Sequence, residues 1–276
     1  MKNKILILSD LHFGESREST TISGIIRQAN TQAKETFQSI IPKLKEIKPN
    51  LLVHMGDALR DTYKKDIDSK NLSEAISLVE SVGVPTIHLL GNHELNAFEY
   101  GEIENIYDTA IQKHEFFGFM DLDEFQIVWL DLEIDENNLA YISEKRLQWL
   151  MNLSLNKKPT ILFSHYSLAS IDSSGSFYFE NNPQGMYYKN FNEVKDILTS
   201  LNIKLFINAH VHLLTHQKID TQHFISNPAF SENITAEKYP ENNPGIYSVL
   251  EIDDNNFVFT SYSGSFCFAK IQGELG

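Results

Sequence analysis

Five short apolar runs divide the first three quarters of the chain, and each of them ends at polar residues. The runs cover residues 5–8, 51–53, 84–90, 160–163 and 203–207. Short apolar runs bounded by turn residues are typical of strands that are buried on both faces. The pattern therefore predicts five buried strands in this part of the chain.

Between these runs, apolar residues recur at the spacing of a helix. The first stripe consists of Phe37, Ile40, Ile41, Leu44 and Ile47, and Pro42 is expected to kink or restart that helix. Further helices are expected to start near three polar residues, Ser73, Ser143 and Asn192. The alternation of strands and helices predicts an α/β fold.

From about residue 219 the pattern changes to short β-like runs at residues 223–225, 245–252, 257–262 and 265–269. The polar residues 253–256 between two of these runs indicate a hairpin turn. The sequence has no linker rich in Pro, Gly or Ser and no internal repeat. We therefore expect one domain over residues 1–276 that contains two sheets.

Residues that can bind metal follow each of the five N-terminal runs: Asp10 and His12, Asp57, Asn92 and His93, His165, and His210 and His212. Ligands in α/β sheets gather at the carboxyl ends of strands, so these side chains are expected at one sheet edge. In extended backbone, residues i and i+2 point the same way. Each Asp-x-His or His-x-His pair can therefore converge, unless a loop conformation splits it between two ions.

The donor set of Asp, Asn and His indicates transition-metal chemistry. Imidazole suits zinc and iron, while carboxylate and amide oxygens suit manganese. The histidines exclude the all-oxygen cage that is typical of calcium. Two divalent ions about 3.5–4 Å apart can clamp the attacking and leaving oxygens of a phosphoryl displacement. The set therefore fits a pair of transition-metal ions (manganese, iron or zinc), which could act on a phosphoester substrate.

The ordered motifs resemble those of the calcineurin-like metallophosphoesterase superfamily. In this chain they are Asp10-Leu-His12, Gly56-Asp57, Gly91-Asn92-His93-Glu94, Ser164-His165 and Ala209-His210-Val211-His212. The resemblance covers residues 5–212 and implies a four-layer α/β/β/α sandwich of two mixed β-sheets flanked by helices. The last motif departs from the family at Ala209, where glycine is usual. Alanine can occupy that place if its φ stays negative.

Carried over to this sequence, the resemblance implies two metal sites that share one carboxylate. The expected ligands are Asp10, His12 and His212 for one ion and Asn92, His165 and His210 for the other, with Asp57 between them. The implied mechanism is in-line attack of a metal-bound hydroxide on phosphorus. His93 is expected to bind no metal and to act either as the general acid or as a hydrogen-bond donor to the phosphate.

Composition and charge limit the class of protein. The chain has 276 residues, 42% of them hydrophobic, which is typical of a soluble globular protein. No run approaches the roughly 20 apolar residues that a helix needs to cross a bilayer. The apolar run at the start of the chain is too short for the apolar region of a signal peptide. A cytoplasmic location is expected. The single cysteine, Cys267, excludes an internal disulfide and a thiolate metal cluster.

The motifs and the charge also narrow the substrate. Protein phosphatases of this superfamily carry Asp-Arg-Gly after Gly-Asp and an arginine after Asn-His-Glu, and residues 56–61 and 94–97 supply neither. The net charge of −14 gives no broad surface for duplex nucleic acid, which disfavours a DNA nuclease. A small phosphodiester, either a nucleotide or a cyclic nucleotide, fits best, as in the cyclic-nucleotide phosphodiesterase-like branch. The alternatives are a lipid-linked pyrophosphate hydrolase and a non-catalytic binding scaffold.

Several segments beside the motifs are candidates for contact with the substrate. Loops are expected at residues 14–30, 60–72 and 166–191, and the last is expected to form a substrate wall. Residues 95–119 carry apolar side chains that suit either a cap beside the metals or a helix packed on the core.

Four single residues near the motifs also have expected roles. Arg60, Asp61 and His216 are candidate substrate-binding residues, since each lies a few positions beyond a predicted ligand. Arginine can bind a phosphate through two hydrogen bonds. Glu94 is expected to act as a cap or as a partner of the ligands rather than as a ligand.

Overall fold

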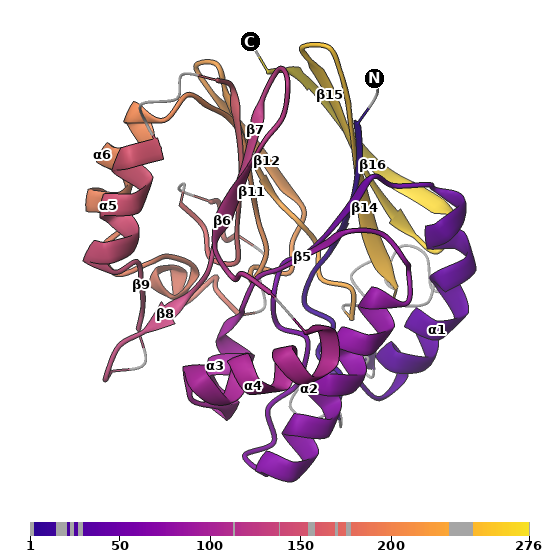
Figure 1. Cartoon of the computed structure of the whole chain (residues 1–276). Coiled ribbons are helices and arrows are strands. Elements are labelled where there is room, and N and C mark those ends of the chain that lie inside the picture. Colours follow the sequence, from indigo (N-terminus) through magenta and orange to yellow (C-terminus); the bar gives the residue numbers. More distant parts are fainter. Residues whose placement is uncertain are drawn as a thin grey trace.

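Two mixed six-stranded β-sheets form the centre of the fold, with helices on their outer faces (Figure 1). The structure is a computed structural model. It describes residues 3–14, 21–22, 25–26, 30–112, 114–137, 139–153, 158–168, 171–174, 178–231 and 245–275. The predicted α/β sandwich is confirmed.

The first sheet has the strand order β16-β15-β14-β1-β4-β5. Its strands are β1 (Asn3–Leu8), β4 (Leu51–His54), β5 (Thr86–His88), β14 (Ile246–Asp253), β15 (Asn256–Ser263) and β16 (Phe266–Glu274). Strands β1, β4 and β5 are parallel, whereas β14, β15 and β16 form the antiparallel half. The predicted hairpin lies between β14 and β15.

The second sheet has the strand order β12-β13-β11-β10-β7-β6. Its strands are β6 (Gly118–Asp121), β7 (Gln126–Leu130), β10 (Thr160–Ser164), β11 (Ile203–Asn208), β12 (Thr215–Ile219) and β13 (Gln222–Ser226). Two short pairs lie outside the sheets: β2 (Thr21–Ile22) with β3 (Ile25–Ile26), and β8 (Glu133–Ile134) with β9 (Ala140–Tyr141).

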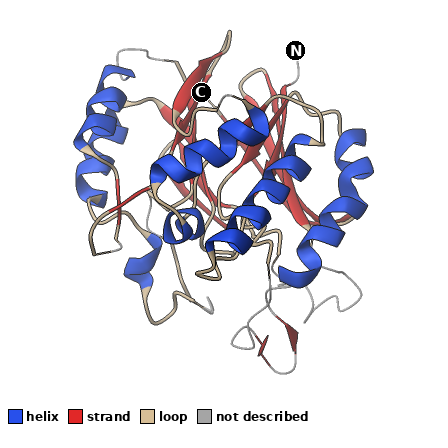
Figure 2. Ribbon diagram, turned by 60° about the horizontal axis from the view of Figure 1, so that its bottom comes forward, coloured by secondary structure: helices blue, strands red, loops and turns tan. Residues whose placement is uncertain are grey.

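Helices cover the outer face of each sheet (Figures 1 and 2). On the first sheet lie α1 (Asn30–Glu46), α2 (Lys65–Glu80), α3 (Asn92–Ala97) and α4 (Tyr100–Ile111). On the second lie α5 (Glu144–Leu153) and α6 (Phe191–Ser200), and a short 3-10 turn η2 covers Pro183–Met186. In the described residues, no helix combines the length and apolarity that a membrane span requires.

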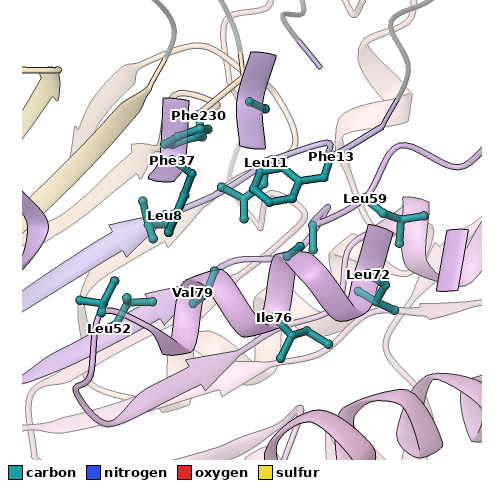
Figure 3. Packing of buried hydrophobic residues seen from close by; sticks show 14 of the residues in the cluster. Leu8, Leu11, Phe13, Phe37, Leu52, Leu59, Leu72, Ile76, Val79 and Phe230 are labelled. Carbon is teal, nitrogen blue, oxygen red and sulfur yellow. The ribbon is translucent and has the colours of Figure 1, made fainter. Parts of the chain in front are cut away.

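Three apolar clusters hold the four layers together. Along β1, Ile5 and Ile7 face the cluster between the two sheets, whereas Leu6 and Leu8 face the cluster under the helices of the first sheet. This alternation is the two-residue period of a strand, and it explains why β1 is apolar throughout. Figure 3 shows the outer cluster, where Phe37 of α1 packs near Phe230. The third cluster lies under α5 and α6.

Some predicted boundaries differ from the structure. Helix α2 begins at Lys65 and not at Ser73, so the predicted loop at residues 60–72 ends at Lys64. Pro42 lies inside α1, which continues to Glu46. The predicted loop at residues 14–30 contains β2 and β3, and most of it lies outside the described residues.

Part of the segment 95–119 packs on the core as a helix. Helix α4 buries Ile103 and Tyr107 in the outer cluster of the first sheet, and Phe116 joins the same cluster. These three side chains therefore serve the core, and a cap formed by the rest of the segment stays a prediction.

Candidate metal centre

The predicted ligands lie where strands and loops meet at one edge of the two sheets. Asp10 follows β1, Asp57 follows β4, and Asn92 is the first residue of α3, which follows β5. His165 follows β10 directly, and His210 comes two residues after β11. Parallel neighbours end at the same edge, so residues far apart in sequence meet there.

Four of these side chains form a first cluster. Asp10, His12, Asp57 and His212 are buried and offer ligand atoms that all lie within 4.8 Å of one another. The Nε2 atoms of His12 and His212 are 3.1 Å apart, and His212 Nε2 lies 3.3 Å from Asp10 Oδ1. The set of two carboxylates and two imidazoles therefore converges on one point.

A second cluster shares Asp57 with the first. It consists of Asp57, His165 and His210, whose ligand atoms also lie within 4.8 Å of one another. His165 Nε2 is 3.4 Å from Asp57 Oδ2 and 3.4 Å from Asn92 Oδ1, which brings the amide to this cluster. The carboxylate of Asp57 thus stands between the two groups, where a bridging ligand is needed.

The chemistry of these residues fits two bound cations. Both carboxylate oxygens of Asp10 are buried without a hydrogen-bond partner, which is costly for a charged group unless a cation compensates it. His165 Nδ1 donates to the carbonyl of Met55 at 2.7 Å, and His210 Nε2 donates to the carbonyl of Gly185 at 3.0 Å. Such bonds fix the ring and leave its other nitrogen for a metal. The mixed oxygen and nitrogen set suits transition metals.

The backbone at the ligands is left-handed rather than extended, so the two pairs are positioned by tight turns and not by the alternation of a strand. The φ angles are 54° at Asp10, 48° at His12, 53° at Asp57, 67° at His210 and 61° at His212. The tight turns bring the first pair to one cluster and split the second pair between the two clusters. Ala209 has no positive φ, which is the condition under which alanine can replace the usual glycine.

Hydrogen bonds between two loops hold these turns. Asp10 N donates to the carbonyl of Gly56 at 3.1 Å, and His12 N donates to that of Asp57 at 3.0 Å. Phe13 N continues the pairing to the carbonyl of Ala58 at 2.9 Å. The loops that carry the ligands of the first cluster therefore form one unit.

The buried side chain of Glu94 links the loop of Asp57 to the loop of Gly91. Its fully buried carboxylate accepts hydrogen bonds from the backbone N–H groups of Asp57 at 3.1 Å, Ala58 at 2.6 Å and Gly91 at 2.8 Å. Burial and the nearby charge of Asp57 raise the pKa of Glu94 to about 7. A side chain at position 91 would collide with the Asp57 carboxylate, which explains the glycine there.

His93 lies beside both clusters with one ring nitrogen already engaged. Its Nδ1 donates a hydrogen bond to the carboxylate of Asp61, which is buried. Its Nε2 lies 3.9 Å from Asp57 Oδ2, and its ring makes an edge contact with His12 at 4.7 Å between centroids. His93 is therefore oriented by Asp61 and faces the shared carboxylate.

The neighbouring imidazoles keep Asp57 ionised. Burial by itself would raise the pKa of Asp57, but the charges of His165 and His93 and a hydrogen bond with His165 outweigh it and hold the pKa well below its usual range. Burial by itself would lower the pKa of His165. The charge of Asp57 and its hydrogen bond to His165 outweigh burial and raise this pKa to about 9. The centre thus favours a negative charge at the bridging position.

The three predicted substrate-binding residues lie in different surroundings. Asp61 contacts His93. Arg60 lies close enough to the first cluster for its charge to be among the causes, after burial, that lower the pKa of His12. His216 lies on β12, where its Nε2 is 3.0 Å from His223 Nδ1, and it belongs to neither ligand cluster.

The sequence did not identify the aromatic residues that pack on the ligand histidines. Tyr166 stacks on His210 with centroids 4.0 Å apart and an angle of 18° between the rings. Phe179 contacts His210 at 5.0 Å, and Tyr178 contacts His212 edge-on at 5.3 Å. The sequence signals were the position of Tyr166 directly after His165 and the aromatic residues within segment 166–191. Part of this segment therefore packs on the ligand histidines, and its role as a substrate wall stays a prediction.

Solved structures with the same architecture have low sequence identity to this chain. A dimetal phosphatase from Danio rerio matches with a TM-score of 0.77 and 14% identity, over 99% of both chains. A purple acid phosphatase from yellow lupin matches with a TM-score of 0.62 and 13% identity, over 99% of this chain and 54% of the other. The structure of TT1561 from Thermus thermophilus matches with a TM-score of 0.55 and 15% identity, over 100% of both chains. At such identities the likeness shows the fold.

The sequence itself matches one family model over most of its length. No curated protein matches the chain. Residues 3–214 match the model of the calcineurin-like phosphoesterases, which is more than half of the 276 residues. The chain therefore belongs to the calcineurin-like phosphoesterase family, and its two buried Asp and His clusters make it a metal-dependent phosphoesterase with a dinuclear metal site.

Proposed function

We propose that the enzyme hydrolyses a small phosphodiester, either a nucleotide or a cyclic nucleotide, like the cyclic-nucleotide phosphodiesterase branch of the superfamily. The observation that carries the proposal is the arrangement of His93 beside the shared carboxylate of Asp57, with its other ring nitrogen held by Asp61. A diester has a leaving oxygen that needs a proton when it departs, and a positioned histidine can supply it.

Each residue of the centre has a proposed role in this reaction. Two divalent ions such as manganese, iron or zinc, when bound, would clamp the phosphate oxygens and lower the pKa of the attacking water. The residues that would hold them are Asp10, His12 and His212 for one ion, Asn92, His165 and His210 for the other, and Asp57 for both. His93 Nε2 would donate to the leaving oxygen, and Asp61 would stabilise the protonated imidazole.

A cavity beside α3 supports a substrate of modest size. The cavity has a volume of about 610 Å³ and is lined by residues 95–100 together with Lys65, residues 133–135 and Tyr141. Ligand cavities commonly have volumes of roughly 300–1,000 Å³. Asn96 lies three residues beyond His93 on α3, so the cavity begins about one helical turn from the proposed acid. It could receive the group that leaves with the oxygen.

The alternative functions have less support. A lipid-linked pyrophosphate hydrolase needs an apolar groove beside the metals, and the apolar side chains Ile103 and Tyr107 of α4 are buried in the core. A non-catalytic scaffold does not need a complete ligand set, yet every expected ligand lies in or beside the two clusters.

An activity panel on the metal-loaded protein tests the proposal. Metal content is measured first, and two equivalents per chain are expected. The manganese-loaded enzyme is then assayed with a generic phosphodiester, a phosphomonoester, 2′,3′- and 3′,5′-cyclic nucleotides, dinucleotides and a lipid pyrophosphate. Turnover should be highest among the nucleotide diesters, and His93→Asn should lower it while both metals remain bound. Preference for the monoester or the lipid pyrophosphate would refute the proposed substrate class.

A further inference from the structure

A buried segment directly after strand β13, residues 226–231, connects the two sheets at the edge that carries the metal ligands. It comes after residues 3–214, the part of the chain that matches the family model, so the family motifs do not include it. The whole segment is buried, and three of its residues, Ser226, Asn227 and Ser231, have polar side chains. Buried polar groups need hydrogen-bond partners. The partners of this linking segment therefore show what it holds in place.

One end of the linking segment is fixed to the second sheet. Asn227 N donates to the carbonyl of Asn208 at 2.6 Å, which continues the parallel pairing of β13 with β11 beyond the ends of both strands. The side-chain amide of Asn208 donates to Ser226 Oγ at 3.3 Å. Strand β11 leads directly into the turn of His210 and His212. This end is therefore fixed to the base of the loop that carries both histidines.

The other end of the linking segment holds the residues that follow β1 in the first sheet. Asn227 Nδ2 donates to Ser9 Oγ at 2.8 Å, and Phe230 N donates to the carbonyl of Ser9 at 2.8 Å. Ser231 donates twice to the carbonyl of Asp10, through Oγ at 2.9 Å and through its backbone N at 3.3 Å. The side chain of Ser231 is fully buried, so water does not compete for the first of these bonds.

The position of the Asp10 carboxylate depends on the backbone of this residue. Within the described part of the chain neither carboxylate oxygen has a hydrogen-bond partner, so no such bond fixes the side chain directly. The backbone is left-handed, with φ 54°, and needs support from its surroundings. Asp10 N donates to the carbonyl of Gly56, and the two bonds from Ser231 hold the carbonyl on the other side of the turn. His212 Nε2, from the second sheet, lies 3.3 Å from Asp10 Oδ1.

We propose that Ser231, through the linking segment, positions Asp10 against His212 for binding the ion of the first cluster. Groups that hydrogen-bond to a metal ligand fix its orientation and raise the affinity for the metal. Here the bond acts on the backbone of the ligand, and its support comes from the sheet that carries the opposing ligand. Asp10 belongs to the first cluster alone, so loss of this bond should affect one site and leave the other intact. The inference concerns metal binding and does not depend on the proposed phosphodiester.

Titration of the metal-free protein with zinc against a chelator tests the proposal. Ser231→Ala removes the hydroxyl and should weaken binding of one of the two zinc equivalents about 2- to 12-fold, the effect of losing one hydrogen bond. The affinity for the other equivalent should not change. The effect should persist in His165→Ala, which keeps the ligands of the first cluster, and disappear in His12→Ala, which lacks one of them. Ser9→Ala removes the acceptor of Asn227 Nδ2 and should weaken the same equivalent.

A serine elsewhere in the first sheet provides the matched control. Ser261→Ala removes a buried hydrogen bond of 2.8 Å between Ser261 and Ser248, on strands β15 and β14, which carry no ligand of either cluster. Urea unfolding of the metal-free proteins should show a similar loss of stability in Ser231→Ala and Ser261→Ala, but Ser261→Ala should leave both zinc affinities unchanged. Equal weakening of both equivalents in Ser231→Ala would overturn the proposal. Unchanged affinities in Ser231→Ala, or the same weakening in Ser261→Ala, would also overturn it.

Discussion

The hydrogen bond between Asp61 and His93 gives the sharpest functional prediction. Replacing Asp61 with Asn keeps a side-chain acceptor of the same size but removes its charge. His93 Nδ1 would then donate to a neutral amide oxygen, while Nε2 would still face Asp57. We therefore expect Asp61→Asn to lower kcat, because the protonated imidazole of His93 is less stabilised in the transition state.

The magnitude follows from the difference between the two kinds of hydrogen bond. A bond to a charged group contributes about 1.5–3 kcal/mol and a neutral bond about 0.5–1.5 kcal/mol. The buried position of Asp61 keeps this bond away from solvent screening. A loss of about 1–2 kcal/mol in the transition state corresponds to a fall in kcat of about 5- to 30-fold.

The assay compares two diesters that differ in the basicity of the leaving oxygen. A 4-nitrophenyl ester leaves without a proton, whereas a methyl ester of the same phosphate needs one. If His93 donates that proton, Asp61→Asn and His93→Asn should slow the methyl ester much more than the 4-nitrophenyl ester. If His93 instead stabilises the phosphate, both esters should slow equally.

Metal content provides the control, because Asp61 is not a ligand in either cluster. Both equivalents should remain bound in Asp61→Asn. A variant that kept both metals and hydrolysed the methyl ester within twofold of the wild-type rate would refute the role assigned to the Asp61–His93 pair.

Three further predictions concern stability and metal affinity. Burial holds the pKa of His54 well below 6.5, so the unfolded state takes up a proton that the folded state does not, and stability falls with decreasing pH. In metal-free protein the free energy of unfolding should drop by about 1 kcal/mol more between pH 6.5 and 5.5 in wild type than in His54→Leu, as urea denaturation measures. Arg146→Met should cost about 3–5 kcal/mol, because it leaves the buried Asp131 carboxylate without its bidentate partner, and adding Asp131→Asn should recover part of that loss in the same assay. Tyr166→Ala should weaken metal binding about tenfold in a chelator titration through loss of the stack on His210, whereas Tyr166→Phe should not; equal affinities would contradict this role.

The strands and most of the metal ligands could be predicted from the sequence because both follow from short local patterns. An apolar run such as residues 51–53 predicts a buried strand, and Asp57 comes soon after its end. The carboxyl ends of neighbouring parallel strands meet at one edge, so Asp10, which follows β1, could be expected near Asp57, which follows the neighbouring strand β4. His165 follows β10 of the second sheet, so its contact with Asp57 also depends on how the two sheets pack on each other.

Contacts made by single polar side chains across the fold could not be predicted in this way. Helix α2 starts at Lys65, and the Asp68 carboxylate near its start accepts hydrogen bonds from the backbone and hydroxyl of Thr62 at 2.9 Å and 2.7 Å. The apolar stripe after Ser73 gives no sign of this contact between the helix and the preceding loop. The pairing of Asp61 with His93 likewise depends on the exact course of two loops.

The left-handed turns at the ligands explain why the centre needs so much support from its surroundings. A left-handed residue other than glycine costs about 1–3 kcal/mol, although aspartate and histidine adopt this conformation more readily than most. Five such ligand residues together cost a sum comparable to the stability of a whole domain. The backbone pairing of the two ligand loops and the three hydrogen bonds to Glu94 offset that cost within the protein itself. These contacts between protein groups therefore hold the ligand backbone in its left-handed turns.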